Sequence, residues 1–478
     1  MRSRISRRDF SRAALATAAA GAIAAPAASG RVLGANDRVT VGCIGVGNRG
    51  VQVMNAFCAH KDARIVALSD VYEPYLQGKY DQIDPRFKDL GKRVPTRQPD
   101  FGGPVERVKD FRRLLDRKDI DAVIVATPDH WHAIQMTMAC AAGKDVYAEK
   151  PLSATVREGR RMVEAARKYD RVVQVGLQRR SSGLYAKLAE LVRSGGLGKI
   201  TGARACYASN MAPDGIGRSP DSEPPVGLDW DLWLGPRPSR PFNEEILPYK
   251  FRWWSLYSSQ MANWGVHYFD AMRWIVGERA PASLSAHGGV FAVKDARTIP
   301  DTAEVIFELP SGMLMTFGTY EANGHTGLKS CEIELRGTLG TVFAGSNRFE
   351  IVPERGGAFQ DPAPRRKPLI ESSKDVSEDL DRFHARNFLD CVKSRQRTHS
   401  DVEEGHRSTT FALLANIALA TKARLDWDAD GERFTNNDRA QKGPRRGRDR
   451  RRGPAPPFGP GRRGAIQQRP SRADRLAP

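Results

Sequence analysis

One segment constrains the fold of this chain more than any other, a glycine-rich turn between an apolar strand and an amphipathic helix. Val39–Ile44 is a short, β-branched run typical of a buried strand. Gly45-Val46-Gly47-Asn48-Arg49-Gly50 follows directly, and apolar residues then recur with helical spacing. The first glycine permits a tight turn, the second lets the backbone approach a pyrophosphate, and the third allows the helix to pack closely on the strand. This order predicts a doubly wound, dinucleotide-binding α/β domain.

A carboxylate follows at the spacing of a ribose ligand. A second apolar strand, Arg64–Ser69, ends at Asp70, 20 residues beyond Gly50. An acid there meets the ribose hydroxyls and favours NAD over NADP. NADP stays open, because Arg49 or Lys79 could reach a 2′-phosphate.

Two more predicted strands run into polar segments. Asp121–Ala126 precedes Thr127-Pro128-Asp129-His130-Trp131-His132, with a helix expected from Ala133, and Asp145–Ala148 precedes Glu149-Lys150-Pro151. Doubly wound sheets bind ligands at the carboxyl ends of their strands, so we expect these segments to face the cofactor. The Pro/Gly-rich segment 84–104 is expected to be a surface insertion. The predicted cofactor-binding residues are Gly45, Gly47, Asn48, Arg49, Gly50, Asp70, Thr127, Pro128, Asp129, His132, Glu149, Lys150 and Gln178.

A later segment supplies candidate acid–base groups. Ser259–Gly277 predicts one helix, on which Asn263, His267 and Asp270 share a face. A carboxylate beside a histidine can orient the ring, and the ring titrates near working pH, so the two are a plausible proton-transfer pair. The alternative is an ordinary helix-surface histidine.

Aromatic residues point towards a carbohydrate. Six of the eight tryptophans lie between residues 230 and 274, and an aromatic face suits the C–H face of a pyranose, although core packing is the alternative. We expect at least one of Trp253, Trp254 and Tyr257 to line the pocket. Arg179 and His325 are further substrate candidates. The two nearby histidines His130 and His132 have no third ligand at suitable spacing, so we expect no metal.

Thr127–His132 and Glu149-Lys150-Pro151 behind a GxGxxG turn resemble the Gfo/Idh/MocA family (glucose–fructose oxidoreductase, inositol dehydrogenase and rhizopine catabolism proteins), from about residue 36 to about 440. The resemblance implies an NAD(P)-dependent oxidoreductase of sugars or cyclitols. It also implies a Rossmann domain followed by an α/β domain with an open, mainly antiparallel sheet, often the interface of a homo-oligomer. In the family pattern Lys150 contacts the nicotinamide ribose and the substrate hydroxyl. The pattern Asp-x-x-x-His-x-x-Asp departs at Asn263, which can hydrogen-bond but carries no negative charge.

The basic charge lies at the two ends. Of the net +19, residues 1–38 carry +5 and residues 439–478 carry +11, so the 400 residues between them carry +3. A nearly neutral body does not indicate a nucleic-acid partner. We predict four segments: a signal peptide (1–36), a Rossmann domain (37–155), a substrate and oligomerisation domain with a returning helix at 403–423 (156–438), and a disordered basic tail (439–478).

The first segment resembles a twin-arginine export signal. Ser6-Arg7-Arg8-Asp9-Phe10 precedes a mildly apolar, alanine-rich stretch and the small-x-small site Ala25-Pro26-Ala27. A disordered basic leader is the alternative. Export through the twin-arginine machinery predicts a periplasmic location, and this route carries folded proteins, so the cofactor would be bound before export.

Three functions remain open. The first is an exported NAD(P)-dependent oxidoreductase acting on a sugar or cyclitol hydroxyl with tightly bound cofactor. The second is a redox-neutral NAD-dependent glycoside hydrolase or lyase, which needs no external supply of cofactor. The third is a catalytically inactive sugar-binding protein. The predicted catalytic residues are Lys150, His267, Asp270 and Asn263.

Overall fold

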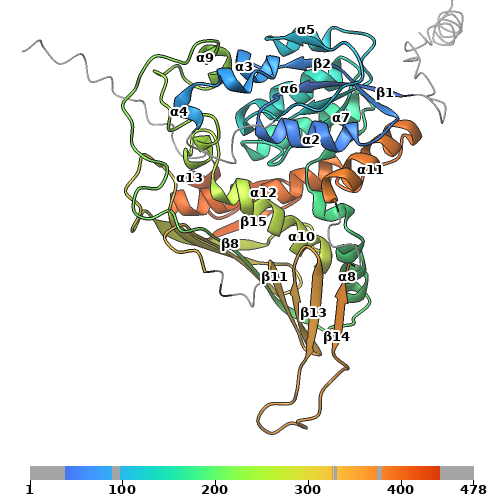
Figure 1. Ribbon diagram of the computed structural model, residues 1–478. Coiled ribbons are helices and arrows are strands. Elements are labelled where there is room, and N and C mark those ends of the chain that lie inside the picture. Colours follow the sequence, from blue (N-terminus) through green and yellow to red (C-terminus); the bar gives the residue numbers. More distant parts are fainter. Residues whose placement is uncertain (1–37, 89–96, 326, 328–330, 374–378, 442–478) are drawn as a thin grey trace, which may run out of the picture.

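The computed structural model describes residues 38–88, 97–325, 327, 331–373 and 379–441. It consists of a parallel sheet wrapped by helices and a larger sheet with helices on one side (Figure 1). The predicted signal peptide, and the predicted tail from residue 442 onward, lie outside the described residues. In the ranges given above, no helix is long and apolar enough to span a membrane.

The first sheet has six parallel strands in the order β3-β2-β1-β4-β5-β6, which confirms the doubly wound fold. Its strands are β1 (Val39–Ile44), β2 (Ala63–Ser69), β3 (Glu106–Val108), β4 (Ala122–Val125), β5 (Asp145–Ala148) and β6 (Val173–Val175). Its helices are α2 (Asn48–Cys58), α3 (Glu73–Gln77), α4 (Pro85–Lys88), α5 (Phe111–Leu115), α6 (Asp129–Ala141) and α7 (Val156–Lys168). The inner strands are continuous apolar runs because helices cover both faces of the sheet.

Three details of this domain correct the sequence-based prediction. The edge strand β3 was not predicted, because its three residues Glu-Arg-Val carry no recognisable apolar run. Helix α6 begins at Asp129 rather than Ala133, with Pro128 as its N-cap residue. The first sheet takes β6 from beyond the predicted boundary at residue 155, so this domain extends further along the chain.

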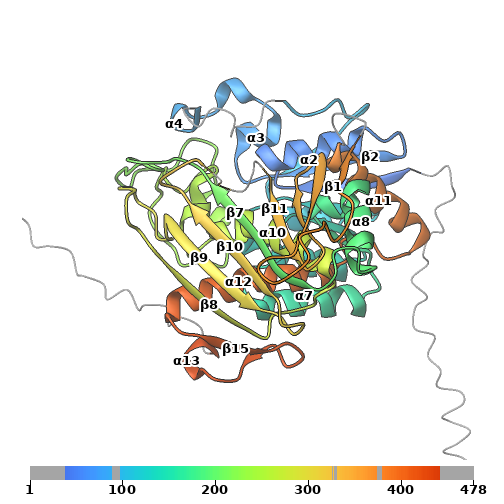
Figure 2. The same cartoon turned by 90° about the horizontal axis from the view of Figure 1, so that it is seen from below.

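The second sheet has ten strands in the order β14-β13-β12-β11-β7-β10-β9-β8-β15-β16. Its strands are β7 (Ile200–Ala208), β8 (Ser283–Gly289), β9 (Thr302–Glu308), β10 (Leu314–Tyr320), β11 (Ile333–Gly337), β12 (Gly340–Ala344), β13 (Arg348–Pro353), β14 (Leu369–Ser372), β15 (Leu425–Asp428) and β16 (Arg433–Phe434). Only β7 and β10 pair in parallel, which confirms an open, mainly antiparallel sheet. Figure 2 shows β7, β8, β9 and β10 from below, in front of the helices α10 (Val266–Val276) and α12 (Val402–Thr421).

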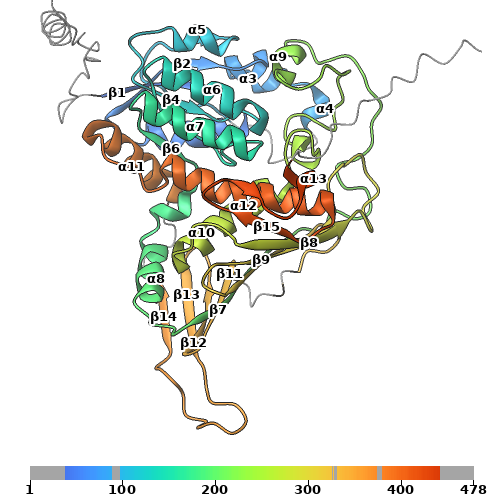
Figure 3. The ribbon, with the colours of Figure 1, turned by 180° about the vertical axis from the view of Figure 1, so that it is seen from behind.

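Two helices from the end of the chain join the domains. Helix α12 lies between the two sheets (Figure 3), as expected for the returning helix, and contacts α7, α10 and β8. It packs so closely on the first sheet that a Cβ at Gly405 would lie 2.3 Å from Val175. Helix α11 (Leu380–Ser394) packs on α2, where the rings of Phe388 and Phe57 lie 5.8 Å apart. The remaining helices are α8 (Gly183–Arg193), α9 (Trp230–Leu234) and α13 (Asp438–Gln441).

Candidate active site

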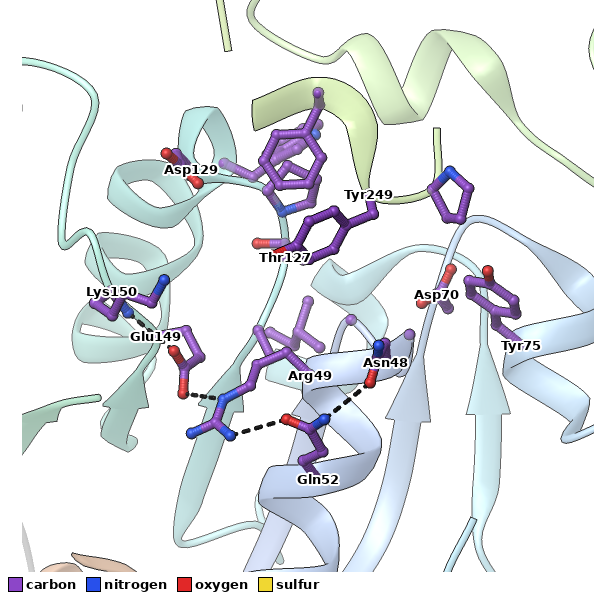
Figure 4. Close-up of a pocket in the computed structure, with 18 of the residues that line it drawn as sticks. Asn48, Arg49, Gln52, Asp70, Tyr75, Thr127, Asp129, Glu149, Lys150 and Tyr249 are labelled. Atoms are coloured by element: carbon purple, nitrogen blue, oxygen red, sulfur yellow. Dashed lines mark hydrogen bonds and ion pairs between the residues drawn. The ribbon is translucent and has the colours of Figure 1, made fainter. Parts of the chain in front are cut away.

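A cavity of about 830 Å³ opens where the carboxyl ends of the parallel strands meet the second domain. The glycine-rich turn, the segments after β4 and β5 and the residues that lead into α10 all contribute to its wall. Figure 4 shows Asn48, Arg49, Asp70, Thr127 and Lys150 around one end of it. The cavity therefore lies where a doubly wound sheet binds its ligand.

The glycine-rich turn has the geometry of a phosphate cradle. Gly45 has φ of +86°, which favours glycine, and a Cβ at Gly50 would lie 2.0 Å from the Gly45 carbonyl oxygen. A Cβ at Gly47 would instead reach only the Tyr75 ring, 3.5 Å away on the cavity wall. Two of the glycines are thus required by the backbone, and the third leaves room for a ligand at the start of α2.

Asp70 ends β2 and is held by the same turn. Its carboxylate accepts a hydrogen bond from the Val46 N–H at 2.8 Å and another from the Tyr72 N–H at 2.9 Å. Burial raises the pKa of Asp70 to about 6, although these backbone donors favour the charged form. Asp70 therefore stands on the cavity wall as an acceptor for ribose hydroxyls.

Arg49 forms ion pairs that connect the cofactor end of the cavity with helix α11. Its Nε donates to Glu149 at 2.8 Å, and its Nη atoms donate to both oxygens of Asp381 at 2.9 and 2.7 Å. Asp381 belongs to α11, and sequence reasoning missed it because no motif surrounds it. Since two carboxylates already hold Arg49, it is poorly placed to bind a 2′-phosphate.

Lys150 and Asn263 meet across the domain boundary. The Lys150 Nζ donates to the Asn263 backbone oxygen at 2.8 Å and to its Oδ1 at 3.1 Å. Burial lowers the pKa of Lys150 to about 8, and the positive charge of Arg252 adds to this effect. A lysine with such a pKa can exchange a proton near neutral pH.

His267 lines the same cavity as Lys150. Burial holds its pKa well below the usual value, and the charges of Lys150 and Arg179 lower it further. The ring is therefore neutral at pH 7 and can accept a proton from a substrate hydroxyl.

Asp270 does not face His267, which corrects the expected pair. The predicted single helix is a π-helical turn, η5 (Met261–Gly265), followed by α10, and His267 and Asp270 both lie in α10. Residues three apart in a regular α-helix point about 60° away from each other. Asn263 and His267 line the cavity, whereas the Asp270 carboxylate accepts from Arg180 at 2.9 Å and from Ser408 at 2.6 Å. Asp270 is thus a buried ion-pair partner of Arg180 and does not orient the His267 ring.

The expected aromatic residues do not line the cavity either. Trp253 donates to Glu321 at 3.0 Å, Trp254 donates to the Glu245 carbonyl at 2.7 Å, and Tyr257 is buried in the core. His325 is exposed and lies outside the cavity wall. The large aromatic residues that line the cavity are Tyr72, Tyr75, Phe87, Phe111, Trp131, Trp233, Tyr249, Phe251 and Trp264.

Most of the other predicted cofactor residues line the cavity, and one lies behind its wall. Thr127, Pro128, Asp129, Glu149, Gln178 and the substrate candidate Arg179 line the cavity. His132 is buried behind them, with one ring nitrogen 2.7 Å from the Pro151 carbonyl oxygen and the other 2.7 Å from that of Thr127. It ties together the two segments that follow β4 and β5. Across the described residues, no three His, Cys, Asp or Glu side chains gather in a metal-binding group.

Family models match the chain in three places. The model of the oxidoreductase family's NAD-binding Rossmann fold matches residues 39–177, which include the glycine-rich turn and Glu149-Lys150-Pro151. The GFO/IDH/MocA C-terminal domain matches residues 236–343, and the oxidoreductase family's C-terminal alpha/beta domain matches residues 364–447. Together these matches cover more than half of the chain.

The chain belongs to the Gfo/Idh/MocA oxidoreductase family. Its first domain is the family's NAD-binding domain, and the cradle, Asp70 and the cavity fit that cofactor.

Curated relatives and solved structures within the family differ in activity. The chain is 29% identical over 225 residues to "Glycosyl hydrolase family 109 protein 2" of Shewanella sp. (strain ANA-3), a match that spans 43% of this chain and 46% of that relative. It is 26% identical over 277 residues to "Inositol 2-dehydrogenase 4" of Saccharopolyspora erythraea, spanning 57% and 68%. The crystal structure of aldose-aldose oxidoreductase from Caulobacter crescentus has the same fold, with a TM-score of 0.59, 16% identity, and coverage of 81% of this chain and 99% of that one. The chain thus spans about half the length of the glycosyl hydrolase relative.

Proposed function

We propose that this protein is an exported, NAD-dependent oxidoreductase that oxidises a hydroxyl of a sugar or cyclitol and keeps its cofactor bound. The observation that carries the proposal is the meeting of Lys150, Asn263 and His267 in one cavity with the glycine-rich turn. A neutral histidine can accept the hydroxyl proton, and a lysine ammonium beside it can stabilise the negative charge that develops on the oxygen. The similarity to an inositol 2-dehydrogenase supports a polyhydroxylated substrate.

Residues of the first domain hold the cofactor. The backbone at Gly47 and the start of α2 accommodate the pyrophosphate, and Asp70 binds the ribose hydroxyls. NAD, when bound, supplies the hydride acceptor. Arg49, clamped between Glu149 and Asp381, fixes the wall next to it.

Residues at the domain boundary handle the proton. His267 accepts the proton of the substrate hydroxyl, and Lys150 binds the oxygen as negative charge develops on it. Asn263 holds the Lys150 ammonium through two acceptors and adds no negative charge that would raise the pKa of the lysine.

We also propose export and self-association. The twin-arginine motif at Arg7-Arg8 supports export to the periplasm, where a permanently bound cofactor avoids dependence on free NAD. The open face of the second sheet exposes apolar side chains such as Ile306 and Leu314, which supports a homo-oligomer formed through that face.

The test combines cofactor release and turnover. Purified protein is denatured, and the released nucleotide is identified by mass. Native protein is then mixed with sugars, cyclitols and glycosides while absorbance at 340 nm is followed. We expect bound NAD that a sugar or cyclitol reduces, and loss of turnover with retention of NAD in His267→Ala. Turnover that survives His267→Ala would contradict the assigned base, and a protein that binds no NAD would contradict the function.

A second candidate is redox-neutral cleavage of a glycoside. It is favoured by the similarity to proteins named glycosyl hydrolase family 109, and such a reaction leaves the cofactor unchanged after each cycle. The same experiment separates the two candidates, since cleavage of a glycoside without lasting absorbance at 340 nm indicates the redox-neutral reaction.

A further inference from the structure

One cation of the cavity has no assigned role in the proposed reaction. Arg252 lies on the cavity wall beside Asn263, Trp264 and Lys150. Its Nε donates to Asn263 Oδ1 at 3.1 Å and its Nη1 to the Tyr249 carbonyl oxygen at 3.2 Å. Throughout the described residues, Arg252 forms no ion pair and its Nη2 has no hydrogen-bond acceptor.

Other arginines of the cavity wall are neutralised by carboxylates. Arg49 is held by Glu149 and Asp381, and Arg179 donates to both oxygens of Glu332 at 3.0 and 2.7 Å. Two carboxylates, Glu149 and Asp129, act on Lys150 through their charge, yet neither forms a hydrogen bond with Arg252. Arg252 is therefore the guanidinium that a negatively charged ligand can reach.

The position of Arg252 is fixed by aromatic rings. Its guanidinium carbon lies 3.9 Å from the centre of the Tyr249 ring and 4.4 Å from that of Phe251. Stacking on aromatic faces orients the guanidinium plane and reduces the entropy lost when it binds a ligand. A rigid, planar fork suits a carboxylate, which accepts two parallel hydrogen bonds.

Asn263 keeps this guanidinium available. Its Oδ1 accepts from both Lys150 and Arg252, while its Nδ2 donates to Gln260 Oε1 at 3.1 Å. Gln260 in turn donates to Glu321, which is buried and also accepts from Arg297 and Trp253. This chain of donors fixes the amide so that its oxygen faces the two cations. An aspartate at position 263 would pair with both cations and compete with an anionic ligand.

We propose that the substrate is a sugar acid, and that Arg252 binds its carboxylate next to Lys150. This inference rests on the proposed function, because it names the class of sugar that the same cavity takes. Asn263 is then a specificity residue, since it aligns Lys150 and Arg252 without neutralising them. A neutral sugar gives Arg252 no anionic partner, so it should bind with less free energy than the acid.

Matched pairs of ligands test the proposal without turnover. Calorimetry on the full chain loaded with NADH, which cannot accept a hydride, compares glucuronate with glucose, galacturonate with galactose, and the corresponding methyl glycosides at pH 7. We expect an acid to bind about 10- to 100-fold more tightly than its neutral partner, as one charge-assisted, bidentate contact gives. Arg252→Gln should abolish this preference and Arg252→Lys should retain part of it. Arg433→Gln, at an exposed position of strand β16, should leave it unchanged.

Asn263→Asp is the second variant, since it retains Arg252 and its packing. We expect the preference for the acid to fall at least as far as in Arg252→Lys. Equal binding of acids and neutral sugars, no binding of any acid, or a preference that survives Arg252→Gln would overturn the proposal. Because turnover is read separately at 340 nm, a protein that binds acids but never reduces NAD contradicts the oxidoreductase and not this site.

Discussion

The charges around Lys150 determine how activity depends on pH. The burial that lowers its pKa to about 8, with Arg252 adding to the effect, leaves the ammonium predominant below pH 8 and the free amine predominant above it. Because the proposed reaction needs the Lys150 ammonium to bind the developing oxyanion, kcat/KM should be level below about pH 8 and fall above it. Arg252→Gln removes a positive neighbour, so the pKa of Lys150 and the midpoint of this fall should move to higher pH.

A series of kcat/KM values between pH 6 and 10 checks this prediction, measured with a neutral sugar so that Arg252 makes no contact with the substrate's charge. An unchanged midpoint in Arg252→Gln would show that Lys150 does not control the profile. His267 is no alternative source of the fall, because its pKa is held well below 6.5.

Two glycines of the same turn should respond differently to alanine. In Gly50→Ala the new Cβ would lie 2.0 Å from the Gly45 carbonyl oxygen, so the strand and helix must separate and the protein should lose about 1–3 kcal/mol of stability. In Gly47→Ala the new methyl group enters the cavity without a clash, so the melting temperature should change little. NAD should nevertheless bind at least 10-fold more weakly.

Thermal unfolding of the NAD-free protein and NAD titration separate the two effects. Equal loss of stability in both variants would contradict the assignment of Gly50 to helix–strand packing and of Gly47 to the space for the cofactor.

At the scale of helices and strands, local patterns were sufficient for some elements and not for others. The strand, turn and helix around Gly45–Gly50 were predictable, because the conformation of this segment follows from the order of residues within the segment itself. The separate role of Asp270 was not, because its partners Arg180 and Ser408 lie 90 and 138 positions away in the chain. The pairing of Arg49 with Asp381 was likewise hidden, since it joins residues 332 positions apart.

The clustering of tryptophans in the sequence predicted that aromatic side chains line the cavity, but the residues selected from it were the wrong ones. Trp253 and Trp254 are neighbours in the chain, yet both turn their indole N–H groups to buried acceptors. Trp131, from the first domain, and Trp264 line the cavity instead. A pattern in sequence indicates that aromatic residues gather, but only the fold decides which of them face the ligand.

Helix α11 should stabilise the first domain through Phe388. This side chain is fully buried, with its ring 5.8 Å from Phe57 and 6.0 Å from Tyr147. Phe388→Ala should therefore lower the free energy of unfolding by about 3–5 kcal/mol. Phe383→Ala, in the same helix but 47% exposed, should lower it by less than about 1 kcal/mol. Denaturant unfolding followed by circular dichroism tests the pair, and similar losses would show that α11 is not anchored at Phe388.

For the whole molecule, the N-terminal motif predicts the route of export. Replacing Arg7 and Arg8 together with lysine should retain the charge but abolish transport, because twin-arginine recognition requires the guanidinium pair. The full chain and the variant are expressed in a bacterium, and their distribution between cytoplasm and periplasm is measured. Export of the variant at the original level would favour the basic-leader interpretation.

The ion pair between Arg49 and Asp381 makes completion of the nucleotide site depend on a late stage of synthesis. The glycine-rich turn emerges from the ribosome early, but Asp381 lies in the last quarter of the chain, so the wall of the nucleotide site is complete only when translation is nearly finished. A prematurely terminated chain would lack that wall and would retain nucleotide poorly. Under the proposed export of the folded protein, retained nucleotide would then mark the chains whose nucleotide site was completed before transport.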